Sequence, residues 1–372
     1  GDAAITPDVA AAAHAATGGN PRLVHHLAHD RRRAASGTGP RHRVERRRAA
    51  PEPGARPGVL ADRVWHSALD RLGDDARHLV DLLAVAGKPL TRDVVARALP
   101  PGSPVEALVD AAVAAGVARV SGNDVEVIAA GCRAVVLGLV DDDARTDLHE
   151  RLGRALDAAA SGPLASAAHY LAARHRDPAR AMAAAAAAGR AAAAASMHVE
   201  AATLFGAAAD IAAAGVDVAA GRRLALEQAE SLRRAGDPRH VDIAWDVARR
   251  AAESDDREAR ALAAIALCKL GPLSVAGSLD TATAEYVEAA LAVTHEPALR
   301  ARCASQATLF YSMSGNVERC RELYDVALEA AHRSGEPRVL LDALGSAYVS
   351  LTHPDDWPQR AQAAAEMLAL AE

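Results

Sequence analysis

Lysine and aromatic side chains are scarce in this chain of 372 residues. Lys88 and Lys269 are its only lysines, and aromatic residues make up 3% of the sequence, whereas hydrophobic residues make up 51%. Ala, Leu and Val therefore supply most of the apolar surface, and such a composition favours thin, closely packed helices. A GC-rich genome would produce the same excess of Ala and Arg, so we give these two counts no functional weight.

Cysteine is also rare, and there are no obvious targeting or membrane segments. Cys132, Cys268, Cys303 and Cys320 lie far apart without a CxxC pair, which argues against a disulfide framework or a zinc knuckle. No signal peptide is evident, and no charge-free apolar run reaches membrane-spanning length outside the Ala-rich block 181–195. The net charge of −6 argues against a general nucleic-acid-binding surface. We expect a cytoplasmic protein with no membrane partner.

Motifs for catalysis are missing as well. A phosphate-binding loop needs GxxxxGK[ST], but Gly87-Lys88 is followed by Pro89 and lacks the upstream glycine. The sequence contains no HExxH, GxSxG or GxGxxG motif, and no nucleophile has an evident base. We therefore predict that this chain is not an enzyme, has no catalytic residues and holds no cofactor of its own.

Histidines and acidic residues raise the question of a metal site. The histidines that could cluster are His25-His26-His29 and His149-His169-His175. Neither group has a carboxylate or cysteine placed to complete a site, and surface histidines explain them more simply. The acidic run 141–143 is better explained as a helix start, because acids there oppose the positive end of the helix dipole. We predict no metal site.

Composition and pattern divide the chain into four segments. Residues 1–30 favour two short helices separated by Gly18-Gly19, and residues 31–58 form a flexible linker rich in Arg, Pro and Gly. Residues 59–160 contain amphipathic helices followed by a hairpin signal at 121–124, the order expected of a small winged-helix-like domain. Residues 161–372 are expected to be helical throughout.

Two helix starts are predicted within the winged-helix-like domain. Thr91 can cap the helix that follows it. Ser103 and Glu106 have the spacing of a capping box, with Pro104 at the first helical position.

A repeat runs through the helical segment. Its frame is a small residue, a small or apolar residue five positions on, a bulky residue four further, and Ala three beyond that. The copies are Ser196, Ala201, Phe205, Ala208; Gly236, Val241, Trp245, Ala248; Gly277, Ala282, Tyr286, Ala289; Gly315, Cys320, Tyr324, Ala327; and a degraded Asp356, Ala361, Ala365, Leu368. The period near 40 residues leaves room for two antiparallel helices and their turns.

The chemistry of the frame predicts an α-solenoid. Small residues let helices approach, and the rings fill the gaps between successive helix pairs, so we expect the aromatic residues to be core. One pair cannot bury its own apolar face, and pairs of this kind therefore stack. The frame is similar to the second helix of the tetratricopeptide repeat, although its period exceeds the usual 34 residues. The predicted fold is mainly α: a winged-helix domain, then tetratricopeptide-like hairpins.

The order of these segments resembles the middle of STAND-class signal-transducing ATPases, and above all the LuxR-type large ATP-binding transcription regulators. Residues 17–21, "TGGNP", match the turn in the helical lid of that family's ATPase core. Residues 69–99 look like the opening of its winged helix, and residues 145–157, "RTDLHERLGRALD", like the passage into its repeat arm. One departure is at Ile128-Ala129, where the family usually has Arg-His, so that only Arg133 remains of the polar pattern.

The resemblance implies a piece of a longer protein. Residues 1–30 would be the C-terminal remnant of the lid, with Gly19 and Pro21 close to a nucleotide, ATP or ADP, that the missing core binds. DNA would be bound only by a further C-terminal domain. The arm would receive a protein partner or a small inducer, and a homo-oligomer stays open. The departure at Ile128-Ala129 suggests altered nucleotide sensing.

Three other functions compete with this sensor role. A freestanding scaffold would use the repeats to assemble proteins without an ATPase. A DNA binder would use the winged helix together with the arginines of the linker, at 31–33 and 46–48, but the wing "SGND" carries no Lys or Arg. An enzymatic role would require hydrolysis by this chain alone.

Overall fold

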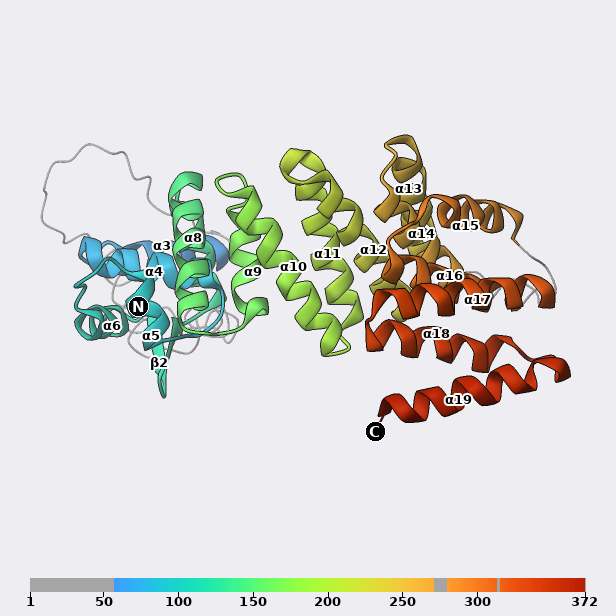
Figure 1. Ribbon diagram of the computed structural model, residues 1–372. Coiled ribbons are helices and arrows are strands. Elements are labelled where there is room, and N and C mark those ends of the chain that lie inside the picture. The colour runs from blue at the N-terminus through green and yellow to red at the C-terminus, as the bar shows by residue number, and fades with distance from the viewer. Residues whose placement is uncertain (1–56, 271–279, 313–314, 372) are drawn as a thin grey trace, which may run out of the picture. The chain divides into compact units, whose positions relative to one another are not determined.

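The computed structural model describes residues 57–270, 280–312 and 315–371, which form two compact units divided between Arg176 and Asp177 (Figure 1). The helices expected within residues 1–30, and the linker up to residue 56, lie outside the described residues. Each unit is presented by itself. Both are built mainly of α-helices, and the first also contains a small sheet.

The first unit begins with alternating helices and short strands. Its elements are α3 (Pro57–Leu69), α4 (Asp74–Ala86), β1 (Leu90–Thr91), α5 (Arg92–Ala98), α6 (Val105–Ala114), β2 (Ala118–Ser121), β3 (Asp124–Val127), α7 (Ala130–Leu139), α8 (Asp142–Ala158) and α9 (Pro163–Ala172). The strands form an antiparallel sheet in the order β1-β3-β2. Helix, strand, two helices and a two-stranded wing in this order form a winged helix, as the sequence predicted.

Local chemistry explains the ends of these elements. The β2–β3 hairpin turns at Gly122, whose φ of 62° is a left-handed conformation that glycine adopts at little cost. Thr91 caps α5 by accepting a hydrogen bond from the amide of Val94 at 3.4 Å, as predicted. The predicted capping box is wrong: the Ser103 hydroxyl donates to the Pro100 carbonyl, and Glu106 pairs with Arg92 instead.

Helix α4 organises the core of the first unit. It packs against α6, α7, α8 and β3. Leu79, Val80, Leu82 and Leu83 are all at most 2% exposed, and Trp65 from α3 is fully buried in the same cluster. Full burial of each such side chain is worth about 1.5–3 kcal/mol, which makes this cluster the main source of the unit's stability.

Helices α8 and α9 form a hairpin at the end of the first unit. Its centre is Gly153, where a Cβ atom would lie 2.8 Å from the ring of Tyr170, so the ring packs directly on the α8 backbone. The Tyr170 hydroxyl also donates to Asp157 at 2.7 Å. Helix α9, which lies beyond the limit of residue 160 expected for the winged-helix-like domain, thus packs within the first unit.

The second unit is a series of helices. They are α10 (Pro178–Ala194), α11 (His198–Ile211), η1 (Ala212–Val216), α12 (Val218–Arg234), α13 (Arg239–Glu253), α14 (Arg257–Leu270), α15 (Thr281–Val293), α16 (Pro297–Ser312), α17 (Val317–Ser334), α18 (Pro337–Ser350), η3 (Pro354–Asp356) and α19 (Trp357–Ala371). Consecutive helices pack as antiparallel neighbours (Figure 1). In addition, α12 packs on α14, α14 on α16 and α16 on α18, so these even-numbered helices form one continuous layer. The predicted α-solenoid of helix hairpins is confirmed.

Every copy of the repeat frame falls at the start of an odd-numbered helix, α11, α13, α15, α17 or α19. In the copies that the structure describes at this position, the first frame residue lies just before the helix. Ser196, Gly236 and Gly315 all have a φ between 60° and 75° there, while Gly277 lies outside the described residues. The small first residue is therefore explained by the left-handed turn that joins the helices.

The aromatic residues of the frame are buried to different degrees. Phe205 and Tyr324 are 2% and 4% exposed. Trp245 and Tyr286 are half-buried and meet edge to face, with ring centroids 5.9 Å apart. The Tyr286 hydroxyl also donates to the Ala248 carbonyl at 3.3 Å, which ties α15 to α13. Two rings thus lie in the core and two bridge successive odd-numbered helices.

The small and apolar positions of the frame are buried in some copies and exposed in others. Ala201, Ala208, Cys320 and Ala327 are buried. In α15 the small frame residues are exposed, and the buried side chains lie one or more positions further along; these are Thr283, Ala284, Val287, Ala290 and Leu291. In the degraded fifth copy the last three positions face solvent, and Leu368 is 69% exposed.

By length and composition, the stretch His198–Val216 is apolar enough to cross a membrane. It corresponds to α11 and η1, and it packs between α10 and α12. These contacts bury 33% of the apolar window, including Ala201 and Ala208.

Candidate functional site

The two residues predicted to lie near a nucleotide, Gly19 and Pro21, are outside the described residues. The failed phosphate-loop candidate, Gly87-Lys88, has another role. Gly87 ends α4 with a φ of 67°, and its amide donates to the Leu83 carbonyl. Arg133, the polar residue left in the family pattern, packs on Gly87 and donates to the Ala84 carbonyl at 2.7 Å. Both residues therefore stabilise the C-terminal end of α4.

The structure brings together two of the histidines that the sequence marked as a possible cluster. Nδ1 of His149 in α8 lies 2.9 Å from Nδ1 of His169 in α9, whereas His175 is exposed. Burial, followed by the charges of His149 and Lys88, lowers the pKa of His169 to about 4. Burial and the nearby Arg145 also lower the pKa of His149. At neutral pH both rings are neutral, and one Nδ1–H donates to the other Nδ1.

This pair predicts a loss of stability in mild acid. The unfolded chain binds a proton on residue 169 near pH 6.5, whereas the folded chain binds it only near pH 4. Stability is therefore full above pH 6.5 and falls as the pH drops toward 4. Between pH 7 and pH 5 the expected loss of unfolding free energy is about 2 kcal/mol.

Urea unfolding followed by Trp65 fluorescence, with Trp245 and Trp357 changed to Phe, measures this effect in the first unit. The variant His169→Gln lacks the ring whose pKa is lowered to about 4 and keeps only His149, so it should lose most of the dependence on pH. An unchanged dependence in that variant would assign the effect to other groups.

The acidic run behaves as predicted, since Asp141 accepts a hydrogen bond from the amide of Ala144 at 2.7 Å and starts α8. Among residues 57–270, 280–312 and 315–371, no three or more His, Cys, Asp or Glu side chains are grouped to hold a metal ion. All four cysteines are buried thiols, and burial raises the pKa of Cys132 to about 12. These thiols are packing residues rather than reactive ones.

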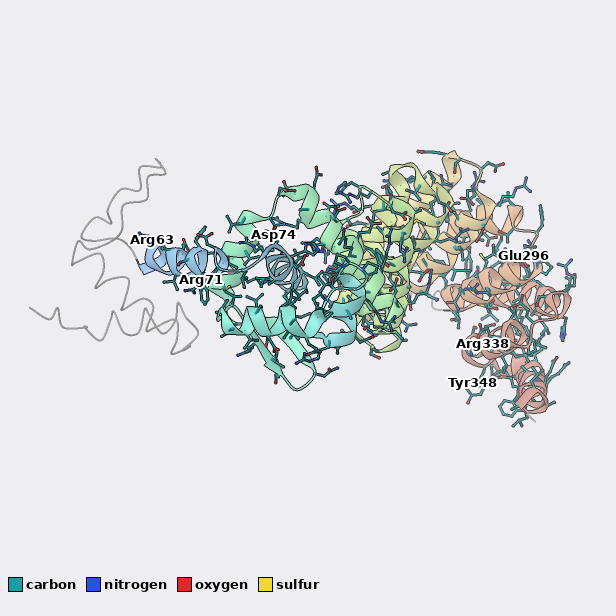
Figure 2. All side chains as sticks on the ribbon, turned by 90° about the vertical axis from the view of Figure 1, so that its left-hand side faces the viewer. Arg63, Arg71, Asp74, Glu296, Arg338 and Tyr348 are labelled. Carbon is teal, nitrogen blue, oxygen red and sulfur yellow. The ribbon has the colours of Figure 1, made fainter. Side chains whose placement is uncertain are left out.

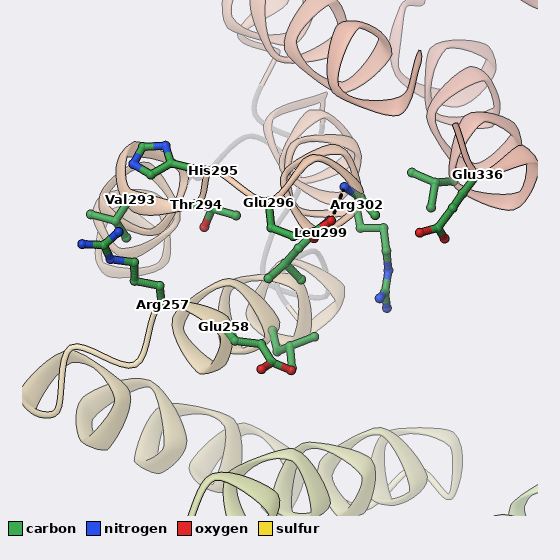
Figure 3. A pocket seen from close by; sticks show the side chains of 12 residues that line it. Arg257, Glu258, Val293, Thr294, His295, Glu296, Leu299, Arg302 and Glu336 are labelled. Atoms are coloured by element: carbon green, nitrogen blue, oxygen red, sulfur yellow. Dashed lines mark hydrogen bonds between the residues drawn. The ribbon is translucent and has the colours of Figure 1, made fainter. Parts of the chain in front are cut away.

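A pocket of about 590 Å³ lies in the second unit, where the N-terminal ends of α14, α16 and α18 meet (Figure 3). We call it the even-face groove, because three even-numbered helices build it. Its lining residues are Arg257, Glu258, Leu262, Val293, Thr294, His295, Glu296, Ala298, Leu299, Arg302, Glu336 and Val339. The apolar side chains form its floor, and the charged side chains around them are exposed. The groove is thus open to solvent and suits an extended ligand better than an enclosed small molecule.

Two of the three acidic groups in the groove already have partners. The Glu296 carboxylate accepts from the amides of Ala298 and Leu299, at 2.9 and 2.6 Å, and so caps α16. Glu258 pairs with Arg223 of α12 at 3.4 Å. Both acids are therefore engaged in holding the helices.

Arg257, Arg302 and Glu336 differ from these two acids. Within the part of the chain that the structure describes, none of the three has an opposite charge within 4 Å. Arg302 lies beside Leu299 and Glu336 at one end of the groove, while Arg257 and His295 lie at the other end (Figure 3). Two guanidinium groups without a partner outnumber one free carboxylate, so the groove favours a negatively charged ligand group.

A second exposed cluster lies where α18 meets α19. The Arg360 guanidinium lies 5.1 Å from the ring centre of Tyr348 and 5.9 Å from that of Trp357. These rings are 63% and 66% exposed, and Tyr348 projects from α18 (Figure 2). Trp, Tyr and Arg are the residues that dominate protein interfaces.

In the winged helix, neither α6 nor the tip of the wing at 121–124 carries a Lys or Arg. In such a fold the third helix is the one that enters the major groove. Here that helix is α6, with exposed Glu106 and Asp110 and no Lys or Arg, and the wing ends in Asp124. Phosphate binding through this face would be opposed by charge.

The sequence reading missed the groove and the earliest hairpin contacts. The groove lies mostly at helix starts, outside the repeat frame, so periodicity could not mark it. The hairpin contacts did leave a signal in the sequence, because Gly153 precedes Tyr170 by about the same spacing as Gly189 precedes Phe205. Each ring packs on its glycine, where an added Cβ atom would lie 2.8 Å from the ring.

No protein-family model and no curated protein matches this sequence. Among solved structures, the chain is similar to a Signal Transduction ATPase with Numerous Domains (STAND) protein with a tetratricopeptide repeat sensor from Pyrococcus horikoshii. The two sequences are 12% identical, and the TM-score is 0.40. The match covers 99% of this chain and 58% of that one, so the chain spans less than two thirds of the length of that protein.

Proposed function

We propose that this chain is the regulatory or sensor segment of an ATP-dependent transcription regulator of the LuxR type, and that its repeats bind a protein partner through the even-face groove. The observation that carries the proposal is the groove itself, with two unpaired arginines over an apolar floor. ATP or ADP would bind to the longer protein, because this chain contains no phosphate-binding loop.

Two features support a sensor rather than a DNA-binding role. A winged helix followed by helical repeats is the order that the sequence resemblance implies for the regulators. The acidic α6 and the wing tip at 121–124, which has no Lys or Arg, fit a contact with protein better than a contact with phosphate. The winged helix would then relay the state of the repeats to the ATPase core.

The gene that encodes the chain tests the regulator proposal directly. We expect a GxxxxGK[ST] motif upstream and a helix-turn-helix domain downstream in the same reading frame. In the longer protein, Arg302→Glu should alter the change in ATP hydrolysis that the partner causes, with little change in hydrolysis without the partner. A start codon close to residue 1 would instead favour the freestanding scaffold.

A gel shift separates the sensor from a DNA binder. Because its basic runs lie in the linker and not on α6 or the wing, we expect weak binding without sequence preference, lost as salt rises from 50 to 200 mM. Sequence-specific binding that is lost on changing residues of α6 would contradict the sensor proposal.

A further inference from the structure

Ion pairs join successive even-numbered helices at one end of the second unit. Arg190 of α10 pairs with Glu227 of α12 at 3.0 Å. Arg223 of α12 pairs with Glu258 of α14 at 3.4 Å. Each junction therefore matches one basic side chain with one acidic side chain from the next even-numbered helix.

The next two junctions are different. Among the described residues, no ion pair joins α14 to α16 or α16 to α18, although charged side chains are present at both. The odd-numbered helices nearby are joined, since Arg319 of α17 pairs with Glu288 of α15. Among the described residues that line the groove, unpaired charge thus begins with Arg257 of α14 and continues with Arg302 of α16 and Glu336 at the start of α18.

Arg302 is the central unpaired group. Its guanidinium has no partner among the described residues, and it lies beside Leu299 of the floor. A guanidinium binds a carboxylate through two parallel hydrogen bonds, which are stronger than neutral ones. The floor beside it, Leu262, Leu299 and Val339, offers apolar surface to the neighbouring side chains of a ligand.

We infer that the even-face groove binds an acidic peptide segment of a protein partner, with an Asp or Glu side chain on Arg302 and an adjacent apolar side chain on the floor. This inference rests on the proposed sensor function and names the chemistry of its partner. Nucleic acid fits less well, because the groove offers two separate guanidinium groups and the free carboxylate of Glu336 rather than a row of basic side chains for successive phosphates.

The test uses the whole 372-residue chain, immobilised, and a phage library of random 12-residue peptides. Enriched peptides are expected to contain Asp or Glu next to Leu, Val or Phe. The best peptide is then synthesised with a fluorescent label, and its affinity is measured by anisotropy. Circular dichroism of every variant checks that the fold is intact.

Three variants give different expected results. Arg302→Ala should weaken binding by about 10- to 100-fold, because a charge-assisted pair is lost. Glu336→Gln should strengthen binding by about two- to fivefold, because a repelling charge is removed. Arg190→Ala is the matched control: it removes an arginine from the same layer that is already paired, and it should change affinity less than twofold.

Two results would overturn the inference and leave the sensor function standing: enriched peptides without acidic residues, or an affinity that Arg302→Ala leaves unchanged. If no peptide is enriched, the inference fails. If, in addition, the Arg302→Glu change leaves the partner's effect on ATP hydrolysis intact in the longer protein, the proposed role of the groove fails with it.

Discussion

Replacing Phe205 by alanine is expected to lower the unfolding free energy of the second unit by about 3–5 kcal/mol, the usual cost of removing a buried phenylalanine ring. The ring is 2% exposed and fills the space above Gly189, where even a Cβ atom would lie only 2.8 Å away. Because the residue beneath the ring is a glycine, α10 offers no side chain there to fill the cavity that the variant would leave. Urea unfolding followed by circular dichroism measures the loss.

Leu368→Ala is the matched control, because Leu368 occupies the last position of the degraded fifth copy of the frame and is 69% exposed. Its expected cost is within about 0.5 kcal/mol, as for other surface positions. Equal costs for Phe205→Ala and Leu368→Ala would contradict the view that the frame marks packing positions. Gly189→Leu should also destabilise, since the added side chain meets the ring.

The repeat architecture could be predicted from the sequence because its cause is local. A bulky residue nine positions after a small one places its side chain two and a half helical turns beyond the left-handed turn at positions such as Gly236 and Gly315. The pattern therefore marks where the odd-numbered helices of the second unit begin. The wing was equally visible, because Gly122 between two Val-containing strands is a short-range signal.

The groove could not be predicted, because it depends on pairing between residues about 35 positions apart. Arg223 and Arg302 are both exposed arginines on even-numbered helices, and the sequence gives no sign of a difference between them. Only Arg223 pairs with an acid on the next even-numbered helix. The wrong capping box has a similar origin. Ser103 and Glu106 have the correct spacing, but the Ser103 hydroxyl binds the Pro100 carbonyl and the Glu106 carboxylate binds the Arg92 guanidinium instead.

Asp356 provides the second large effect. It is the first frame residue of the fifth copy, it is 1% exposed, and its carboxylate accepts from Arg321 of α17 at 2.5 Å and from the amide of His353 at 3.2 Å. This contact ties α17 to the turn between α18 and α19. Breaking a buried pair by removing one partner costs about 3–5 kcal/mol, because the other charge stays buried without compensation.

Arg321→Ala is therefore expected to cost about 3 kcal/mol, toward the lower end because Arg321 itself is about a third exposed. Asp356→Asn should cost less, about 1–2 kcal/mol, since the amide keeps a hydrogen bond to His353 and leaves no charge behind. The double variant, with Arg321→Ala and Asp356→Asn together, tests whether the uncompensated charge of Asp356 causes the loss. With no buried charge left, its cost should be no greater than that of Arg321→Ala alone, so the two single costs should not add.

Unfolding in urea at pH 7, followed by the fluorescence of Trp357 next to this turn, supplies the three values. Additive costs in the double variant would show that Arg321 stabilises the unit through its packing rather than through the charge of Asp356. Non-additive costs would instead identify this ion pair as the link that fixes α19 on the preceding hairpin, the helix that also carries Trp357 and Arg360 of the exposed cluster.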